Sequence, residues 1–101
     1  MQPAWVSNTV WVELGWVLGK RLRLDRAVVS AALSSILAID TIHTADRHGL
    51  SWAIERYRLG ADWADVVHLI AARGVADTFV TFDRGVAGQA EGTPVLVETL
   101  A

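Results

Sequence analysis

The strongest constraint on the fold of this chain is the succession of short strand-like segments and longer helical patterns. Strand-like segments are expected at 3–7, 39–44, 77–83 and 93–99. Patterns with helical periodicity are expected at 9–20, 26–38, 45–59 and 62–73. Strands separated by helices of this length are joined by right-handed crossovers and lie mainly parallel to one another. The sequence therefore predicts one α/β domain over residues 1–101, a mainly parallel sheet flanked by helices.

Residues at the ends of the predicted helices suit those positions. Residues 7–9 offer side chains that cap the first helix, and Asp25 caps the second. Gly60 is expected to end the third helix and Gly74 the fourth, because glycine adopts the left-handed conformation that closes a helix. These residues support the predicted boundaries.

Composition excludes several classes of protein. The chain has no cysteine, which rules out a disulfide framework and thiolate metal sites and fits a reducing cytoplasm. Its N-terminal apolar run is interrupted by Glu13 and is too short to span a bilayer, so we expect a cytoplasmic protein without a membrane partner. The net charge of −2 does not by itself indicate nucleic-acid binding. The five tryptophans are expected in the core or at an interface.

Four carboxylates follow strand ends or occupy the early part of helices, and they are Glu13, Asp62, Asp65 and Asp83. Ligands of parallel α/β sheets bind at the carboxyl ends of the strands, so these side chains have a common edge at which to meet. Mg²⁺ and Mn²⁺ prefer such oxygen ligands. A bound ion lowers the pKa of a coordinated water and stabilises in-line attack on a phosphodiester. The pattern favours a Mg²⁺ or Mn²⁺ site.

Each carboxylate also has a purely structural interpretation. Helical periodicity puts Glu13 at the border of the buried face, and the alternative is a solvated helix glutamate. Asp62 as an N-cap and Asp65 in the first turn would each stabilise their helix by about 0.3–1 kcal/mol, and capping is the favoured interpretation for Asp62. Asp83 ends an apolar strand and can cap the following turn. Thr81 projects to the same face and can assist a metal-bound water.

Three segments, "VSNTVWVELGWVL", "GADWADVVHLIAA" and "ADTFVTFDRGVA", resemble signature blocks of PIN domains, in particular the VapC-type toxins of toxin–antitoxin pairs. The resemblance covers essentially the whole chain, with the blocks in the family's order. It implies a Mg²⁺- or Mn²⁺-dependent endoribonuclease that acts on RNA, is neutralised by a cognate antitoxin and is typically a homodimer. By this resemblance Glu13, Asp65 and Asp83 are the catalytic metal ligands, and Asp62 supports them.

The chain departs from the family at its start. The family opens with a strand that ends in a metal-binding aspartate, whereas Met1 here falls at what resembles the second strand. That first strand lies in the middle of the family's sheet, so its neighbours would lose a hydrogen-bonded partner. We expect a PIN-like fold truncated at the N-terminus and completed by an intertwined or domain-swapped homodimer.

Two functions follow from this resemblance. The first is the ribonuclease, in which Arg21, Arg23 and Arg84 are candidates for contact with RNA phosphates. The abundance of arginine fits this reading, although a GC-rich genome produces the same bias. The alternative is a truncated, catalytically weak or inactive relative that binds an antitoxin or associates with itself.

Overall fold

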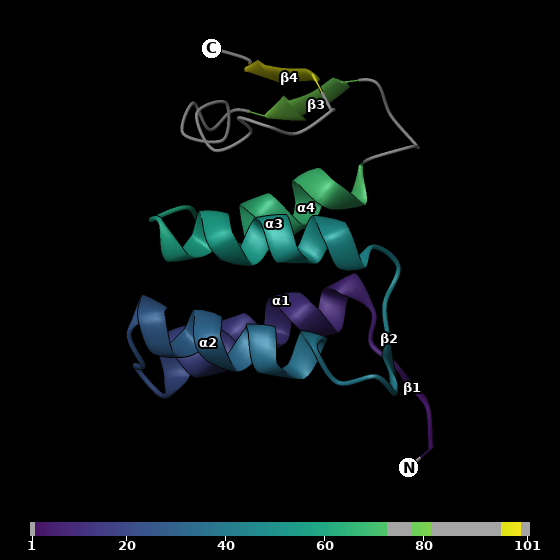
Figure 1. Ribbon diagram of the computed structural model, residues 1–101. Helices are drawn as coiled ribbons and strands as arrows, with labels where there is room; N and C mark the ends of the chain where they lie inside the picture. Colours follow the sequence, from purple (N-terminus) through teal and green to yellow (C-terminus); the bar gives the residue numbers. More distant parts are fainter. Residues whose placement is uncertain (1, 73–77, 82–95, 100–101) are drawn as a thin grey trace.

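The computed structural model describes residues 2–72, 78–81 and 96–99 (Figure 1). Strands and helices follow one another along the chain in the predicted order. The elements are β1 (Ala4–Trp5), α1 (Asn8–Trp16), the π-helix η1 (Val17–Arg21), α2 (Arg26–Leu37), β2 (Ile42–His43), α3 (Arg47–Arg58), α4 (Trp63–Ala71), β3 (Thr78–Thr81) and β4 (Leu96–Thr99). The protein is therefore α/β, with helices making up most of the described part. None of the helices described is long and apolar enough to cross a membrane.

The strands are shorter than predicted and form two separate pairs. β1 lies parallel to β2, with Trp5 opposite His43, and β3 lies parallel to β4. The predicted parallel direction is confirmed for both pairs. The prediction of one sheet is not met within the described residues, where the two pairs share no strand. β1 and β2 are largely exposed, whereas parallel sheets are usually covered on both faces, which explains why their pairing stops after two residues.

The core lies between helices. Figure 1 shows α1 and α2 in one layer and α3 and α4 in the next. α2 packs on α3, α3 on α4, and α1 on α4. All four helices contribute fully buried apolar side chains to the core, among them Trp11, Leu33, Leu50 and Val66. Burying side chains of this size is the main favourable contribution to folding, about 1.5–3 kcal/mol each for a Leu or Val.

Each α-helix in the described part begins at a side chain that accepts a hydrogen bond from the backbone three residues further on. These N-caps are Ser7, Asp25, Asp46 and Asp62. The predicted capping by residues 7–9, by Asp25 and by Asp62 is thereby confirmed. Gly60 ends the segment after α3 with a φ of 120°, which is the left-handed conformation predicted for it. Gly74 lies outside the described residues.

The buried face of the first helix is shifted from the one that periodicity favours, a stripe from Val10 through Leu14 to residues 17–18. Leu14 and Leu18 are partly buried and pack against the core, as that stripe predicts. The fully buried positions, however, are Trp11 and Gly15, and Val10 is 48% exposed. The cause is the packing of Trp63 from α4. Its indole nitrogen donates a hydrogen bond of 2.7 Å to the carbonyl of Trp11. A Cβ atom at Gly15 would lie only 2.2 Å from the Trp63 ring.

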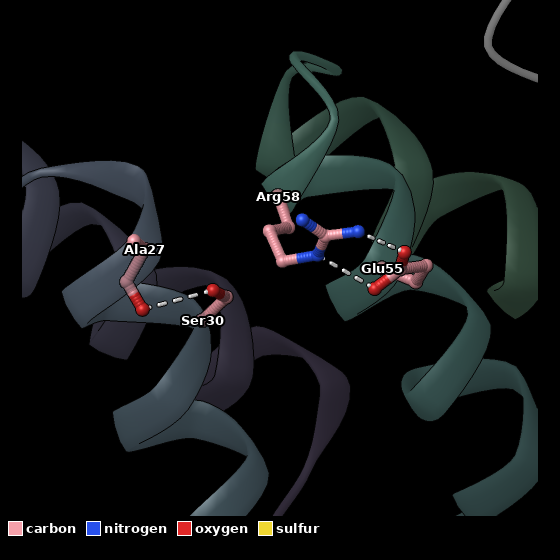
Figure 2. Close-up of polar contacts among 4 residues, drawn as sticks. All are labelled: Ala27, Ser30, Glu55 and Arg58. Atoms are coloured by element: carbon pink, nitrogen blue, oxygen red, sulfur yellow. Dashed lines mark hydrogen bonds and ion pairs between the residues drawn. The ribbon is translucent and has the colours of Figure 1, made fainter.

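Two polar contacts lie within single helices, one buried and one at the surface. Ser30 is buried on α2, and its hydroxyl donates to the carbonyl of Ala27 at 3.1 Å (Figure 2). On the surface of α3, Arg58 forms a two-pronged ion pair with Glu55, also drawn in Figure 2. Exposed pairs of this kind contribute little to stability, about 0–1 kcal/mol.

Candidate functional site

Three of the four predicted carboxylates lie on two helices that pack against each other, α1 and α4. Asp62 caps α4 and accepts a hydrogen bond from the backbone nitrogen of Asp65 at 3.0 Å. Asp65 follows in the first turn and is partly buried. The capping interpretation of Asp62 is confirmed. The position of Asp65 suits the positive end of the helix dipole and leaves its proposed metal role open to experiment.

Glu13 does not border the buried face, which corrects the expectation from periodicity. It is exposed on α1. At about 100° per residue, it lies roughly opposite the face that Trp11 and Gly15 bury. Val10 and Trp16, three residues before and after Glu13, are also exposed, at 48% and 56%. Glu13 is therefore flanked by two large apolar side chains on the outer face of the helix.

The described residues do not bring the predicted ligands together as a metal site. No group of three or more His, Cys, Asp or Glu side chains within residues 2–72 is arranged to hold a metal ion. Glu13, Asp62 and Asp65 therefore do not form such a group by themselves. Asp83 lies outside the described residues, and Thr81 is described only as the last residue of β3.

Two of the three predicted phosphate-binding arginines, Arg21 and Arg23, fall in a basic segment that runs from the end of η1 to the first residue of α2. This segment, residues 20–26, reads KRLRLDR and carries Lys20, Arg21, Arg23 and Arg26. Arg21 and Arg23 are exposed, as contact with RNA requires. Arg23 has a φ of 56°, a conformation that lets the chain reverse direction between the two helices. Arg84 lies outside the described residues.

A cavity of about 300 Å³ adjoins the basic segment. It lies where η1 and α3 end and where α2 and α4 begin, at the end of the helix layers opposite β1 and β2 (Figure 1). Its walls combine aromatic, cationic and carboxylate side chains, and these include Trp16, Lys20, Arg26, Tyr57, Asp62 and Trp63. The sequence analysis did not identify this cavity, because its lining residues come from two regions of the chain far apart in sequence, residues 12–26 and 57–64.

Arg26 is fixed in the wall of this cavity. Its Nη1 donates hydrogen bonds of 2.6 Å to the carbonyls of Tyr57 and Ala61, and its guanidinium lies over the Tyr57 ring, 4.6 Å from the ring centre. A cation in the first turn of a helix opposes the helix dipole. The position of Arg26 directly after the N-cap Asp25 was the signal in the sequence that this side chain has a tertiary role.

No protein-family model matches this chain, and neither a curated protein nor a solved structure matches it.

Proposed function

We propose that the protein is a metal-dependent endoribonuclease of the VapC toxin type, which hydrolyses RNA phosphodiester bonds. The observation that carries this proposal is the order of the helices and strands along the chain, with α1 packed on α4. These helices hold the first two sequence blocks that resemble the family, with Glu13 on one helix and Asp62 and Asp65 on the other. The third block begins with β3, which lies parallel to β4. The order of the elements and the parallel strand pairs support a PIN-like fold.

In this proposal Glu13, Asp65 and Asp83 hold Mg²⁺ or Mn²⁺, with Asp62 and Thr81 in support. The bound ion would supply an activated water at neutral pH and stabilise the charge that develops on the phosphate. Arginines of the basic segment, with Arg84, would contact RNA phosphates, for which the planar guanidinium is well suited.

The proposed assembly is a homodimer, which a cognate antitoxin would bind. Its support is the exposure of large apolar side chains on the first two elements, where Trp5 and Val10 are 65% and 48% exposed. Within the described residues β1 has β2 as its one neighbour, so its other edge is open to a further strand. Large exposed apolar side chains and open strand edges are typical of surfaces that contact another chain.

A second candidate function is a binding module without catalytic activity, which would bind an antitoxin or associate with itself. The observation that favours it is the lack of a three-ligand group among the described residues. The two candidates share the apolar surface and differ in whether a metal binds.

Cleavage of a structured RNA in Mn²⁺ or Mg²⁺ separates the two. Asp65→Asn and Asp83→Asn should each reduce the rate by more than about a hundredfold, because the charge stabilisation that a metal ligand maintains amounts to several kcal/mol. Asp40→Asn is the matched control, since Asp40 is an exposed acid outside the proposed ligand set and should keep the parent rate. Equal rates for the parent and Asp65→Asn, from folded samples, would leave the binding module as the function.

A further inference from the structure

We infer that the cavity beside the basic segment binds one nucleotide unit, a base together with its phosphate. Trp16 supplies the surface for the base. It lines the cavity and is 56% exposed, whereas Trp11 and Trp63 are almost completely buried. An aromatic ring that is half open to solvent at a cavity wall can stack with a flat heterocycle. Every base has such a face, so this contact does not depend on sequence.

Two glycines make room beside Trp16. Gly15 and Gly19 both line the cavity, one in α1 and the other in η1. Trp63 fills the space at Gly15, but a Cβ atom at Gly19 would meet only the Tyr57 hydroxyl, at 3.4 Å. The side of η1 that faces the cavity is thus left open. Short π-helical segments often occur at functional sites.

Lys20 and Arg26 supply positive charge for the phosphate. Both line the cavity, and neither forms an ion pair within the part of the chain that the structure describes. The two Arg26 hydrogen bonds to main-chain carbonyls use only Nη1. Donors on Nη2 and Nε therefore remain for a ligand, on a guanidinium that is already held in place. A fixed cation of this kind makes strong, charge-assisted bonds to a phosphate.

The carboxylates in the wall favour a nucleotide over a simple anion. Asp25 and Asp62 line the same cavity, and each has one oxygen engaged in a helix cap. Their negative charges repel a small inorganic anion, which has no base to stack on Trp16. The second oxygen of Asp25 has no hydrogen-bond partner within the described residues and can accept from the amino group of a base.

The volume of the cavity sets the size of the ligand. About 300 Å³ is at the lower limit for small-molecule pockets, which is room for one nucleotide unit but not for a longer segment of a strand. A free mononucleotide and the terminal nucleotide of an RNA strand present this same chemistry. The base and phosphate contacts follow from the cavity itself, and only their use in RNA cleavage rests on the proposed function.

The test uses the indole resonances of the full chain labelled with ¹⁵N-tryptophan, titrated in EDTA with AMP, adenosine or inorganic phosphate. The five tryptophans give up to five indole signals, assigned by single Trp→Leu variants. AMP should shift the signal of Trp16 and leave that of Trp5 unchanged, because Trp5 lies on β1, away from the cavity. Adenosine should bind more weakly than AMP, and inorganic phosphate most weakly.

Variants separate the base contact from the phosphate contact. Trp16→Leu should weaken AMP and adenosine alike, about 5- to 100-fold, as expected for the loss of one stacked base. Binding of both ligands to Trp16→Leu is measured by calorimetry, because this variant lacks the Trp16 indole signal. Lys20→Gln should weaken AMP by about fivefold or more and leave adenosine unchanged. The matched controls are Trp5→Leu and Arg58→Gln, which remove an exposed indole and an exposed cation outside the cavity.

The inference is overturned if millimolar AMP leaves the Trp16 signal in place, or if Trp16→Leu and Lys20→Gln bind AMP as the parent does. Because EDTA excludes metal-dependent chemistry, this result is independent of RNA cleavage. A short 5′-phosphorylated RNA added in place of AMP identifies the source of the ligand. If the RNA competes with AMP for the cavity beside Trp16, the cavity binds the ends of RNA strands. If AMP binds and the RNA does not, the cavity binds free nucleotides.

Discussion

At the scale of single residues, two glycines about one helical turn apart have opposite roles. Gly15 is required by close packing, since a Cβ atom there would overlap the Trp63 ring at 2.2 Å. Gly19 borders open space in the cavity, with its nearest contact at 3.4 Å. In the sequence both are simply glycines within a helical pattern. Only the position of Trp63, from a helix nearly fifty residues away, distinguishes them.

Gly15→Ala and Gly19→Ala should therefore change stability in opposite directions. Alanine favours a helix over glycine by about 0.8–1 kcal/mol. At Gly15 the overlap with Trp63 outweighs this gain, and we expect a net loss of about 1–3 kcal/mol. At Gly19 we expect a neutral effect or a gain of up to about 1 kcal/mol. Urea unfolding measures both, and equal effects of the two substitutions would contradict the packing described for Trp63.

At the scale of elements, two arginines join the helices in the same way. Arg26 and Arg47 each follow an aspartate N-cap, at the first residue of α2 and α3. Each donates one hydrogen bond to a carbonyl in the last turn of a different helix and another to a carbonyl beyond that helix. Arg26 reaches Tyr57 and Ala61, and Arg47 reaches the carbonyls of Leu37 and Ile42. The last carbonyls of a helix lack partners within it, and these arginines supply donors from outside.

Arg26→Gln should destabilise the fold by about 1–3 kcal/mol, because it removes charged donors from two main-chain carbonyls. Arg58→Gln removes the same charge from an exposed ion pair and should change stability much less. Thermal unfolding followed by circular dichroism compares the two. If both variants melted together, the Arg26 contacts would not be holding the end of α3.

The Glu55–Arg58 pair should make a small contribution to stability that depends on pH. The hydrogen bond from Arg58 lowers the pKa of Glu55 below its ordinary value of 4.5 (Figure 2). A carboxylate with a lowered pKa stabilises the folded state above its ordinary pKa, and this stabilisation is lost as the pH falls through the lowered value. Glu55→Gln should melt slightly below the parent protein at pH 7, and the two melting temperatures should converge as the pH falls below the lowered pKa of Glu55. A difference that grew in acid would contradict this sign.

At the scale of the whole molecule, the helices form the core and leave large apolar side chains exposed on β1 and α1. Trp5 on β1 and Val10 on α1 are both large, apolar and about half exposed or more. The chain is 52% hydrophobic, so its described core does not take up all of its apolar side chains. Covering this surface with a second copy would also give β1 another neighbour, which is the physical basis for the proposed homodimer.

Sedimentation equilibrium should give the mass of a dimer, twice the 11.0 kDa of the chain. A double variant, Trp5→Arg with Val10→Lys, should shift the protein to the monomer, because charges on the apolar surface are costly to bury in a dimer. Arg21→Gln with Asp40→Asn serves as a control that alters two exposed charges elsewhere. A folded parent protein with the mass of a monomer would exclude the homodimer.

The sequence by itself determined the order of strands and helices, the N-caps at Asp25 and Asp62, and the left-handed turn at Gly60, all of which the structure confirms. These features depend on residues close together in the chain, where periodicity and capping preferences act directly. The parallel direction of β1 and β2 was predictable in the same way, from the helical patterns between them.

Only the tertiary structure decided which face of α1 is buried and therefore that Glu13 is exposed. It also decided that Arg26 and Trp16 line the same cavity. α1 is apolar around much of its circumference, so its own sequence pattern does not strongly favour any one of its faces for burial. The Trp63 indole, with its hydrogen bond to the Trp11 carbonyl, selects one of them. Contacts between distant segments depend on the shapes of both segments, whereas the periodicity of one segment carries no information about the shape of the other.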